Sequence, residues 1–187
     1  TVFKTEKDNS QALPHFTADV HAYPIQESPS SSEMRSLPDL NPKSSSSAEH
    51  GTAIHECIAS LPNRTWTEED LEPYKLSDYD QKKLLTFSSS SIYAKCLDKD
   101  IRKEMPFFVD DLENNRTLVG SMDFAAIGEA DIILIDFKTD AADAEQLKQR
   151  YAEQLHAYKR ALHLLWPDKH VRGYLYSFHL DNYVEIN

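Results

Sequence analysis

Residues 120–139, GSMDFAAIGEADIILIDFKT, form the stretch around which the rest of the chain is organised. Two runs of apolar, small or β-branched residues, 118–127 and 131–137, are separated only by Gly128, Glu129 and Ala130. Alternating or apolar runs joined by so short a glycine-containing connection are typical of β-hairpins. The stretch therefore predicts two adjacent antiparallel strands.

Two aspartates and a lysine lie where these strands would bring them together. If the turn is centred between Glu129 and Ala130, residues whose numbers add to about 259 face each other, and Asp123 lies opposite Asp136. Side chains alternate along a strand, so Lys138 is expected on the same face as Asp136. Two carboxylates about 5 Å apart repel by roughly 3 kcal/mol at an effective dielectric constant near 20, and a divalent cation would remove that repulsion. The structural alternative is that Asp123 lies at a strand kink, Asp136 pairs with Lys138, and no ion binds.

Length and composition indicate one globular domain with an irregular arm. The chain has 187 residues, 40% of them hydrophobic, which is enough for one well-formed core. No apolar run approaches the roughly 18 residues that cross a bilayer, so no membrane partner is expected. The first residues, TVFKTEKDNS, lack signal-peptide character. Because the sequence begins with Thr1, we expect it to be a piece of a longer protein.

The net charge of −11 is unfavourable for a protein that binds nucleic acid by itself, because neutralising phosphates needs clustered lysines and arginines. Either the partner is not nucleic acid, or neighbouring domains supply the binding energy. The most basic region is 82–103. Most of its lysines and arginines are expected to solvate helices, and a minority to contact a phosphate backbone.

The two cysteines, Cys57 and Cys96, lie far apart in stretches that are typical of helices. No C-x-x-C spacing occurs, which excludes a four-cysteine iron-sulfur cluster or zinc knuckle built from this chain. A reducing cytoplasm is the expected compartment.

The chain order predicts an arm followed by an α/β domain. Residues 1–46 are rich in proline and serine and predict an irregular arm or linker, while residues 47–187 predict the domain. A capping-box pattern at Ser46 predicts a helix that begins near Ala48 and ends before Pro62. Three short helices are expected after Thr67, Ser77 and the serines at 88–91.

The second half predicts most of a sheet and one long helix. A strand is expected over 104–109, which completes a three-strand meander with the opening hairpin. An amphipathic helix is expected over 143–165, with Leu147, Tyr151, Gln154, Tyr158, Leu162 and Leu165 on its apolar stripe. Strands are expected over 171–178 and 182–186. Taken alone, a histidine such as His55 on the first helix, or a glutamine such as Gln154 on this stripe, is more typical of a structural residue than of a ligand.

Four short motifs occur on these elements in a characteristic order. They are G-T-A-I-H at 51–55, G-S-M-D at 120–123, D-F-K-T at 136–139 and Q-L-H-A-Y at 154–158. In this combination the chain resembles, over roughly 46–178, the RecB-type nucleases of the PD-(D/E)xK superfamily. Within that superfamily it is most similar to the C-terminal nuclease domain of an AddA (RexA) or RecB helicase-nuclease subunit, and the AddA type is favoured. The resemblance implies a restriction-endonuclease-like α+β core, α-β-β-β-α-β, with a mixed central sheet flanked by helices.

The resemblance also implies a metal centre. His55, Asp123 and Asp136 would bind a divalent metal together with the backbone carbonyl of Phe137. Magnesium prefers carboxylates and water, and a histidine among oxygen ligands suits manganese as well as magnesium. Relatives with an iron-sulfur cluster use four cysteines that this chain lacks, so no cluster is expected.

Four further residues receive roles from the resemblance. Lys138 would be the catalytic lysine, which can orient the attacking water, help to deprotonate it or neutralise the phosphate. Gln154 and Tyr158 match the motif that supports the site and contacts the nucleic-acid strand. Glu104 matches an acidic position at the start of the first strand and is given a supporting role.

The implied function is a Mg- or Mn-dependent deoxyribonuclease, the exonuclease domain of a bacterial cytoplasmic helicase-nuclease that acts in double-strand-break repair and recombination. Its partners would be DNA, an attached helicase domain and a second helicase-nuclease subunit. One alternative is a non-catalytic module that keeps the fold to bind DNA or a partner subunit. Another is a free-standing exonuclease, for which the acidic charge is unhelpful.

Overall fold

The computed structural model describes residues 43–187, with side chains from Glu49 onward. Most of the predicted arm over 1–46 therefore lies outside the described residues. The first helix, α1, spans Lys43–Ser60 and begins upstream of the expected start near Ala48. Residues 43–46 of the predicted arm belong to this helix, and the division into arm and domain stays a prediction.

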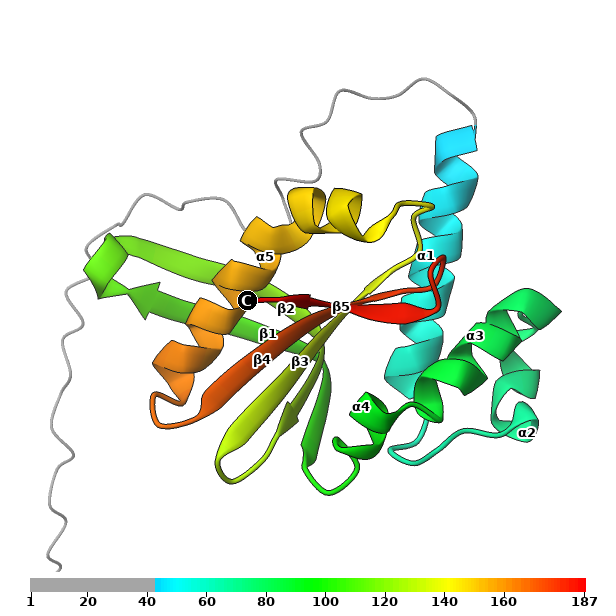
Figure 1. Ribbon diagram of the computed structural model, residues 1–187, viewed down its shortest axis with the longest axis horizontal. Coiled ribbons are helices and arrows are strands. Elements are labelled where there is room, and N and C mark those ends of the chain that lie inside the picture. The colour runs from blue at the N-terminus through cyan, green and yellow to red at the C-terminus, as the bar shows by residue number, and fades with distance from the viewer. Residues whose placement is uncertain (1–42) are drawn as a thin grey trace, which may run out of the picture.

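One five-stranded sheet forms the centre of the molecule (Figure 1). The order in the sheet follows the order in the chain: β1 Asp100–Asp111, β2 Arg116–Ile127, β3 Asp131–Lys138, β4 His170–Ser177 and β5 Asn182–Ile186. The first three strands are an antiparallel meander, β4 runs parallel to β3, and β5 returns antiparallel to β4. The long helix α5, Ala144–Leu165, is the crossover that a parallel pair requires. The predicted α-β-β-β-α-β order and mixed sheet are confirmed.

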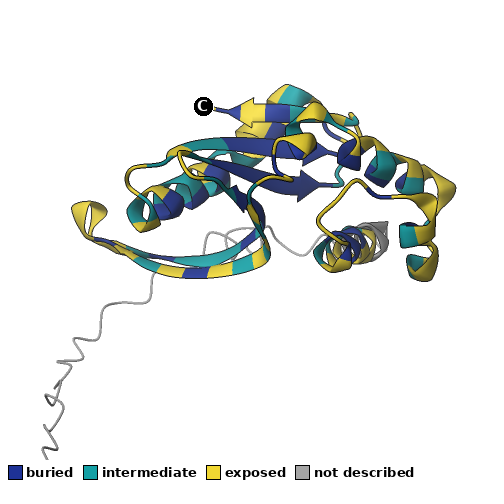
Figure 2. Cartoon of the chain, turned by 90° about the horizontal axis from the view of Figure 1, so that it is seen from below, coloured by how far each residue is buried: buried dark blue, intermediate teal, exposed yellow. Residues whose placement is uncertain are grey.

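The β2–β3 hairpin has the predicted register. Phe124 faces Ile135 and Ala125 faces Leu134, pairs whose numbers add to 259. The turn is closed by the Gly128 amide, which donates to the Asp131 carbonyl at 2.8 Å. Every residue of β3 after Asp131 is buried, as expected for a central strand covered on both faces (Figure 2).

Helices cover both faces of the sheet. On one face lie α1, α2 Glu68–Leu71, α3 Asp78–Ser88 and α4 Ser91–Ala94, together with the 3₁₀ turn Glu72–Tyr74 (Figure 1). A second 3₁₀ turn, Leu112–Asn114, joins β1 to β2. The predicted helix starts are confirmed at Thr67 and Ser77, the N-caps of α2 and α3. Among the described residues, no helix combines the length and apolar composition that a membrane crossing needs.

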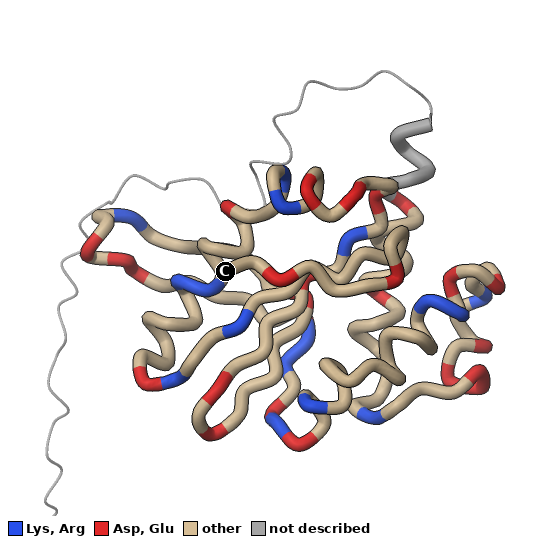
Figure 3. The backbone as a smooth tube through the Cα atoms, in the orientation of Figure 1, with Lys and Arg blue, Asp and Glu red and all other residues tan. Residues whose placement is uncertain are grey.

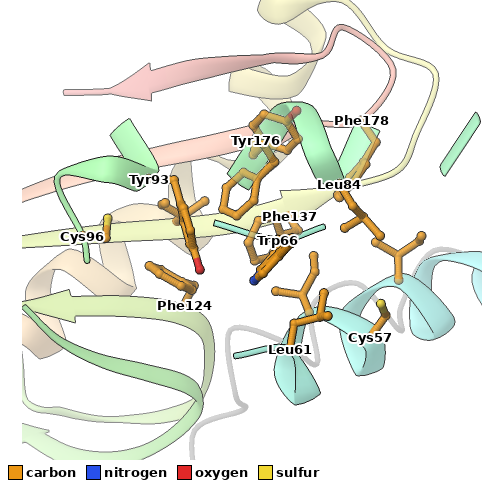
Figure 4. Close-up of a cluster of buried hydrophobic side chains, with 14 of the residues drawn as sticks. Cys57, Leu61, Trp66, Leu84, Tyr93, Cys96, Phe124, Phe137, Tyr176 and Phe178 are labelled. Carbon is orange, nitrogen blue, oxygen red and sulfur yellow. The ribbon is translucent and has the colours of Figure 1, made fainter. Parts of the chain in front are cut away.

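The core between α1–α4 and the sheet is unusually aromatic (Figure 4). Phe87 on α3 is fully buried, and its ring centroid lies 4.9 Å from that of Tyr176 and 5.0 Å from that of Tyr93. Phe137 of β3 packs on the same ring at 5.1 Å between centroids. The strand that carries Asp136 and Lys138 is therefore held from this side by aromatic packing.

Helix α5 covers the other face. Leu147, Leu155 and Leu162 are fully buried against the sheet. A Cβ at Gly173 of β4 would lie 3.1 Å from Leu155, so glycine there allows the close approach of helix and strand. The predicted stripe was wrong at Leu165, which is 45% exposed at the helix end.

A buried ion-pair cluster ties the tip of the β1–β2 hairpin to α5. Asp111 is inaccessible to solvent and accepts hydrogen bonds at 2.7 Å from Arg160 Nη2 and from Asn114 Nδ2. Arg116 Nε completes the cluster at 3.3 Å. The Arg160 guanidinium holds the pKa of the Asp111 carboxyl well below its ordinary value, against the opposing effect of burial.

We expect Asp111→Asn to lower the free energy of unfolding by about 2 kcal/mol, because removing one partner leaves a charged group without compensation. This loss is smaller than the roughly 3–5 kcal/mol typical of breaking a fully buried ion pair. The reason is that Arg160 and Arg116, which cover Asp111, themselves contact water. The folded-state pKa is depressed, so this contribution is present above the unfolded pKa of about 3.9 and is lost as pH falls through the folded value. Urea unfolding from pH 7 to pH 3 should show a constant difference between the two proteins down to about pH 5 and a difference that narrows below about pH 4, with full convergence only below the folded-state pKa.

The matched control is Asp110→Asn, because Asp110 is exposed and accepts only an exposed hydrogen bond from Thr117 in the same hairpin. Its unfolding free energy should stay within about 0.5 kcal/mol of that of the unchanged protein. A difference for Asp111→Asn that is the same at pH 3 and pH 7 would contradict the electrostatic account.

Candidate metal and nuclease site

The backbone of β1 and β2 is distorted where the candidate site lies. Glu104 has a φ of +46°, and the β1–β2 pairing passes from Lys103–Phe124 to Met105–Met122 with no pair between them. Met122 belongs to the core under α5, whereas Phe124 belongs to the aromatic core under α1–α4. The side-chain faces therefore switch at Asp123.

This distortion corrects the expectation of strict alternation. The β2–β3 ladder ends at Phe124–Ile135, so Asp123 and Asp136 lie one residue beyond the last pair. Asp123 Oδ2 accepts a hydrogen bond from the Phe137 amide at 2.8 Å, as a ladder carbonyl would. The kink proposed in the structural alternative is thus present, and it turns the Glu104 and Asp123 carboxylates toward α1.

Three side chains from three elements form a possible metal site. Ligand atoms of His55, Glu104 and Asp123 all lie within 4.8 Å of one another. His55 Nε2 donates to the Phe137 carbonyl at 3.1 Å, and its Nδ1 lies 3.5 Å from Asp123 Oδ1. With the proton on Nε2, the Nδ1 lone pair faces Asp123, and a neutral ring with one free lone pair is the form of histidine that binds a metal.

The electrostatics of these groups fit a cation. Glu104 is exposed to solvent on one side, but its partial desolvation raises the pKa of its carboxyl, and the charge of Asp123 raises it further. Burial alone would lower the pKa of His55, but contact with Asp123 and the charges of Asp136 and Glu104 outweigh it and raise the pKa. One imidazole and clustered carboxylates are the donor types that Mg²⁺ and Mn²⁺ accept.

Asp136 and Lys138 lie side by side on β3. Asp136 is 2% exposed, and its pKa is raised by burial and by the charge of Asp123. Its Oδ2 lies 3.1 Å from Lys138 Nζ, an ion pair. Among the described residues, Asp136 Oδ2 is the buried side-chain atom that accepts no hydrogen bond of good geometry. A buried carboxylate oxygen in this position is suited to binding a cation.

Gln154 and Tyr158 support the lysine from α5. Lys138 Nζ donates to Gln154 Oε1 at 3.1 Å, and Gln154 Nε2 donates to the Tyr158 hydroxyl at 3.0 Å. Tyr158 is 2% exposed and packs edge-on against Phe107, with 5.6 Å between ring centroids. A Cβ at Gly120 would come within 2.9 Å of Phe107, so this packing requires a glycine in the G-S-M-D motif. These contacts fit the supporting part of the predicted role, which stays a prediction together with contact with a nucleic-acid strand.

A hollow of about 460 Å³ opens beside the site. It is lined by α1 residues, among them Gly51, Thr52 and His55, and by Glu104 of β1. A Cβ at Gly51 would lie 3.1 Å from Thr139 Oγ1, so the small residue one turn before His55 brings α1 close to the end of β3. This explains the spacing of the G-T-A-I-H motif.

Most of the basic region 82–103 is already paired within the fold. Lys83 pairs with Asp181 at 3.3 Å and Lys99 with Asp131 at 2.8 Å. Lys103 donates to the Leu61 carbonyl, and burial lowers its pKa to about 8. Figure 3 shows acidic and basic positions interspersed along the described chain. Most of these lysines and arginines therefore stabilise the fold rather than offering a surface for a phosphate backbone.

The structure brings together all eight residues that were singled out from the sequence. His55, Glu104 and Asp123 meet on the α1 side, Asp136 and Lys138 continue the site along β3, and Phe137 links them through its amide and carbonyl. Two features were missed: the direct place of Glu104 among the donor atoms, and the contact of Tyr151 with Lys138, whose Nζ lies 4.0 Å from the ring centroid.

The mixed five-stranded sheet with its covering helices is consistent with the fold of a nuclease superfamily. Residues 32–184 match the PD-(D/E)XK nuclease superfamily, and the chain belongs to it. The predicted family is thereby confirmed.

Individual relatives point to one kind of protein within that superfamily. The chain is 29% identical over 177 residues to an ATP-dependent helicase/nuclease subunit of Clostridium botulinum, a match that covers 77% of this chain and 14% of the relative. For the corresponding protein of Clostridium beijerinckii the identity is 29% over 174 residues, covering 74% and 14%. For that of Anoxybacillus flavithermus it is 29% over 135 residues, covering 67% and 11%. The chain thus spans about one seventh of the length of the first two relatives.

Proposed function

We propose that this chain is a divalent-metal-dependent nuclease domain that hydrolyses the phosphodiester bonds of DNA. The observation that carries the proposal is the convergence of His55, Glu104 and Asp123 within 4.8 Å, next to a buried Asp136–Lys138 pair. Superfamily membership supports a nuclease, and the donor types support Mg²⁺ or Mn²⁺.

The residues that would hold the metal are His55, Asp123 and Asp136, with the Phe137 carbonyl. We add Glu104 as a further ligand, because its carboxylate lies within 4.8 Å of the donor atoms of His55 and Asp123. A bound divalent cation supplies a more acidic water and neutralises charge that develops on the phosphate. Before any cation binds, the Phe137 carbonyl and amide fix the orientations of His55 and Asp123. These two hydrogen bonds to the Phe137 backbone therefore hold the ligand side chains in place in advance.

Lys138 would be the group that meets the reacting phosphate. Its ammonium is held by Asp136 and Gln154, both at 3.1 Å, so its direction is fixed before substrate arrives. A fixed ammonium can hydrogen-bond to a phosphate oxygen and stabilise negative charge that builds up during hydrolysis. It can equally orient the attacking water.

The relatives supply the wider context of the proposal. Since they are named helicase/nuclease subunits, we place this chain as the exonuclease domain of a bacterial, cytoplasmic helicase-nuclease that acts in double-strand-break repair and recombination. An attached helicase domain and a second subunit would supply the DNA binding energy that a net charge of −11 does not.

Two other functions are alternatives to a nuclease domain attached to a helicase. A non-catalytic module would keep the fold without the chemistry, but loss of function normally erodes the very positions, Asp136 and Lys138, that are intact here. A free-standing exonuclease would have to bind DNA with an acidic surface.

Calorimetric titration with MnCl₂, paired with a DNA hydrolysis assay in Mg²⁺ or Mn²⁺, tests the proposal. We expect saturable Mn²⁺ binding, hydrolysis that EDTA stops, and binding weakened about tenfold or more by Glu104→Gln, which removes one ligand charge. The control Asp110→Asn changes a carboxylate on the same strand, about 20 Å away, and should bind Mn²⁺ as the unchanged chain does. Absence of binding at millimolar Mn²⁺ would contradict the proposal and favour the non-catalytic module.

A further inference from the structure

A third side chain holds the Lys138 ammonium, besides Asp136 and Gln154. The Tyr151 ring lies with its centroid 4.0 Å from Lys138 Nζ, a cation–π contact. The Lys138 side chain is only 11% exposed, so this ring is a substantial part of its surroundings. At that distance the ring attracts the ammonium without offering it a lone pair.

Tyr151 reaches the lysine from the same face of α5 as the two predicted support residues. Tyr151, Gln154 and Tyr158 are spaced by three and four residues, so they stack along one side of the helix. Gln154 meets Nζ through a hydrogen bond at 3.1 Å, and Tyr151 meets it through the ring. The two contacts restrain the lysine in different ways, one through a hydrogen bond and one through attraction to the face of the ring.

The ring of Tyr151 is itself fixed in place. Its hydroxyl donates to Asp140 Oδ2 at 2.8 Å, and Arg150 Nη1 lies 3.1 Å from the same oxygen. Asp140 follows Lys138 by two residues, in the segment that leads from β3 to α5. Tyr151 of α5 therefore contacts the β3 side of the chain twice, through its ring at Lys138 and through its hydroxyl at Asp140.

We propose that Tyr151 is a positioning residue for the reaction: its ring keeps the Lys138 ammonium at the point where the scissile phosphate is bound. The inference rests on the proposed nuclease function. A lysine on a flexible four-carbon stem has many rotamers, and a group that fixes one of them raises the fraction of encounters that react. The ring matters for this role, and the hydroxyl serves only to hold the ring.

The kinetic test compares Tyr151→Leu with Tyr151→Phe. Tyr151→Leu removes the aromatic face, and we expect kcat to fall about tenfold while KM for DNA and Mn²⁺ affinity change less than about twofold. Tyr151→Phe keeps the face and should restore kcat to within about threefold of the original value. The matched control is Tyr79→Leu, which removes another tyrosine under a lysine, Lys83 at 5.2 Å, and should leave kcat unchanged.

A second readout needs no nuclease activity. The Tyr151 ring should shift the Lys138 side-chain protons upfield in NMR spectra, with the signals assigned through Lys138→Ala. The shift should persist in Tyr151→Phe and disappear in Tyr151→Leu.

Absence of the shift from the unchanged chain, an unchanged kcat in Tyr151→Leu, or equal losses in Tyr151→Leu and Tyr151→Phe would overturn the positioning role. If the unchanged chain shows the shift and hydrolyses no DNA, the nuclease proposal fails while the contact between Tyr151 and Lys138 is supported.

Discussion

Asp123→Ala and Asp136→Ala are each expected to reduce DNA hydrolysis by about a thousandfold or more, the largest effects that any single change in this chain should have. Asp123 contributes a carboxylate to the donor cluster with His55 and Glu104. Asp136 contributes the buried oxygen beside Lys138. The measurement is steady-state hydrolysis of single-stranded and duplex DNA in Mg²⁺ and in Mn²⁺.

Stability separates a catalytic loss from a folding defect. The Asp136 carboxyl is buried, its pKa is raised, and its Oδ2 lacks a hydrogen bond of good geometry. Its desolvation therefore opposes folding when no cation is bound, and replacing it by alanine should leave the thermal midpoint of the metal-free protein unchanged or higher. A residue kept only for structure would show the opposite sign.

Asp110→Asn is the control here as well, since it alters an exposed carboxylate of the same sheet and should retain full activity. Hydrolysis that survives both Asp123→Ala and Asp136→Ala would refute the assignment of the site. Loss of activity accompanied by loss of the folding transition would leave the structural alternative, an Asp136–Lys138 pair without an ion, as the better account.

Much of the fold was predictable because local signals were strong. The β2–β3 register followed from a three-residue connection between two apolar runs, and β5 begins and ends where its pattern does. Helix α5 begins after Asp143, whose side chain and Gln146 form a capping box. In each case turn or cap chemistry and hydrophobic period indicate the same boundary.

The distortion at Glu104 and Asp123 was not predictable. In a sequence, a glycine or an asparagine indicates a position where a positive φ is favoured. Glu104 has a positive φ, and a glutamate gives no such indication. Strict alternation places Asp123 on the same face of the sheet as Asp136. The kink instead lets Asp123 contact His55, while its neighbours Met122 and Phe124 pack into the cores on opposite faces of the sheet. The direct place of Glu104 in the donor cluster has the same origin.

Helix α1 and Tyr151 show two other limits. A capping-box pattern at Ser46 indicated a helix start that the structure places at Lys43, since such a pattern is also compatible with a helix that continues through it. Tyr151 is one aromatic residue on an amphipathic stripe, which by itself indicates core packing. Its contact with Lys138 depends on the relative placement of β3 and α5, which no local pattern contains.

Phe87→Ala is expected to have the largest effect on stability, lowering the free energy of unfolding by about 4 kcal/mol. The side chain is fully buried at the centre of the aromatic core, so truncation leaves a cavity and removes several edge-to-face contacts at once. Phe87→Leu refills most of the volume and should cost about 1.5 kcal/mol. Urea unfolding monitored by the two tryptophans measures both, since Trp66 lies 5.5 Å from Phe87 between ring centroids.

The same substitution tests whether the aromatic core also shapes the site. Phe137 packs on Phe87 at 5.1 Å, and the Phe137 amide and carbonyl hold Asp123 and His55. Below its melting transition, Phe87→Ala should therefore bind Mn²⁺ less tightly, whereas Phe108→Ala, at a position that is 74% exposed, should change neither stability nor metal affinity. Equal unfolding free energies for Phe87→Ala and Phe108→Ala would refute the packing argument. A destabilised Phe87→Ala with unchanged Mn²⁺ affinity would show that β3 keeps its place through the sheet alone, because its pairing to β4 runs the full length from Asp131 to Lys138.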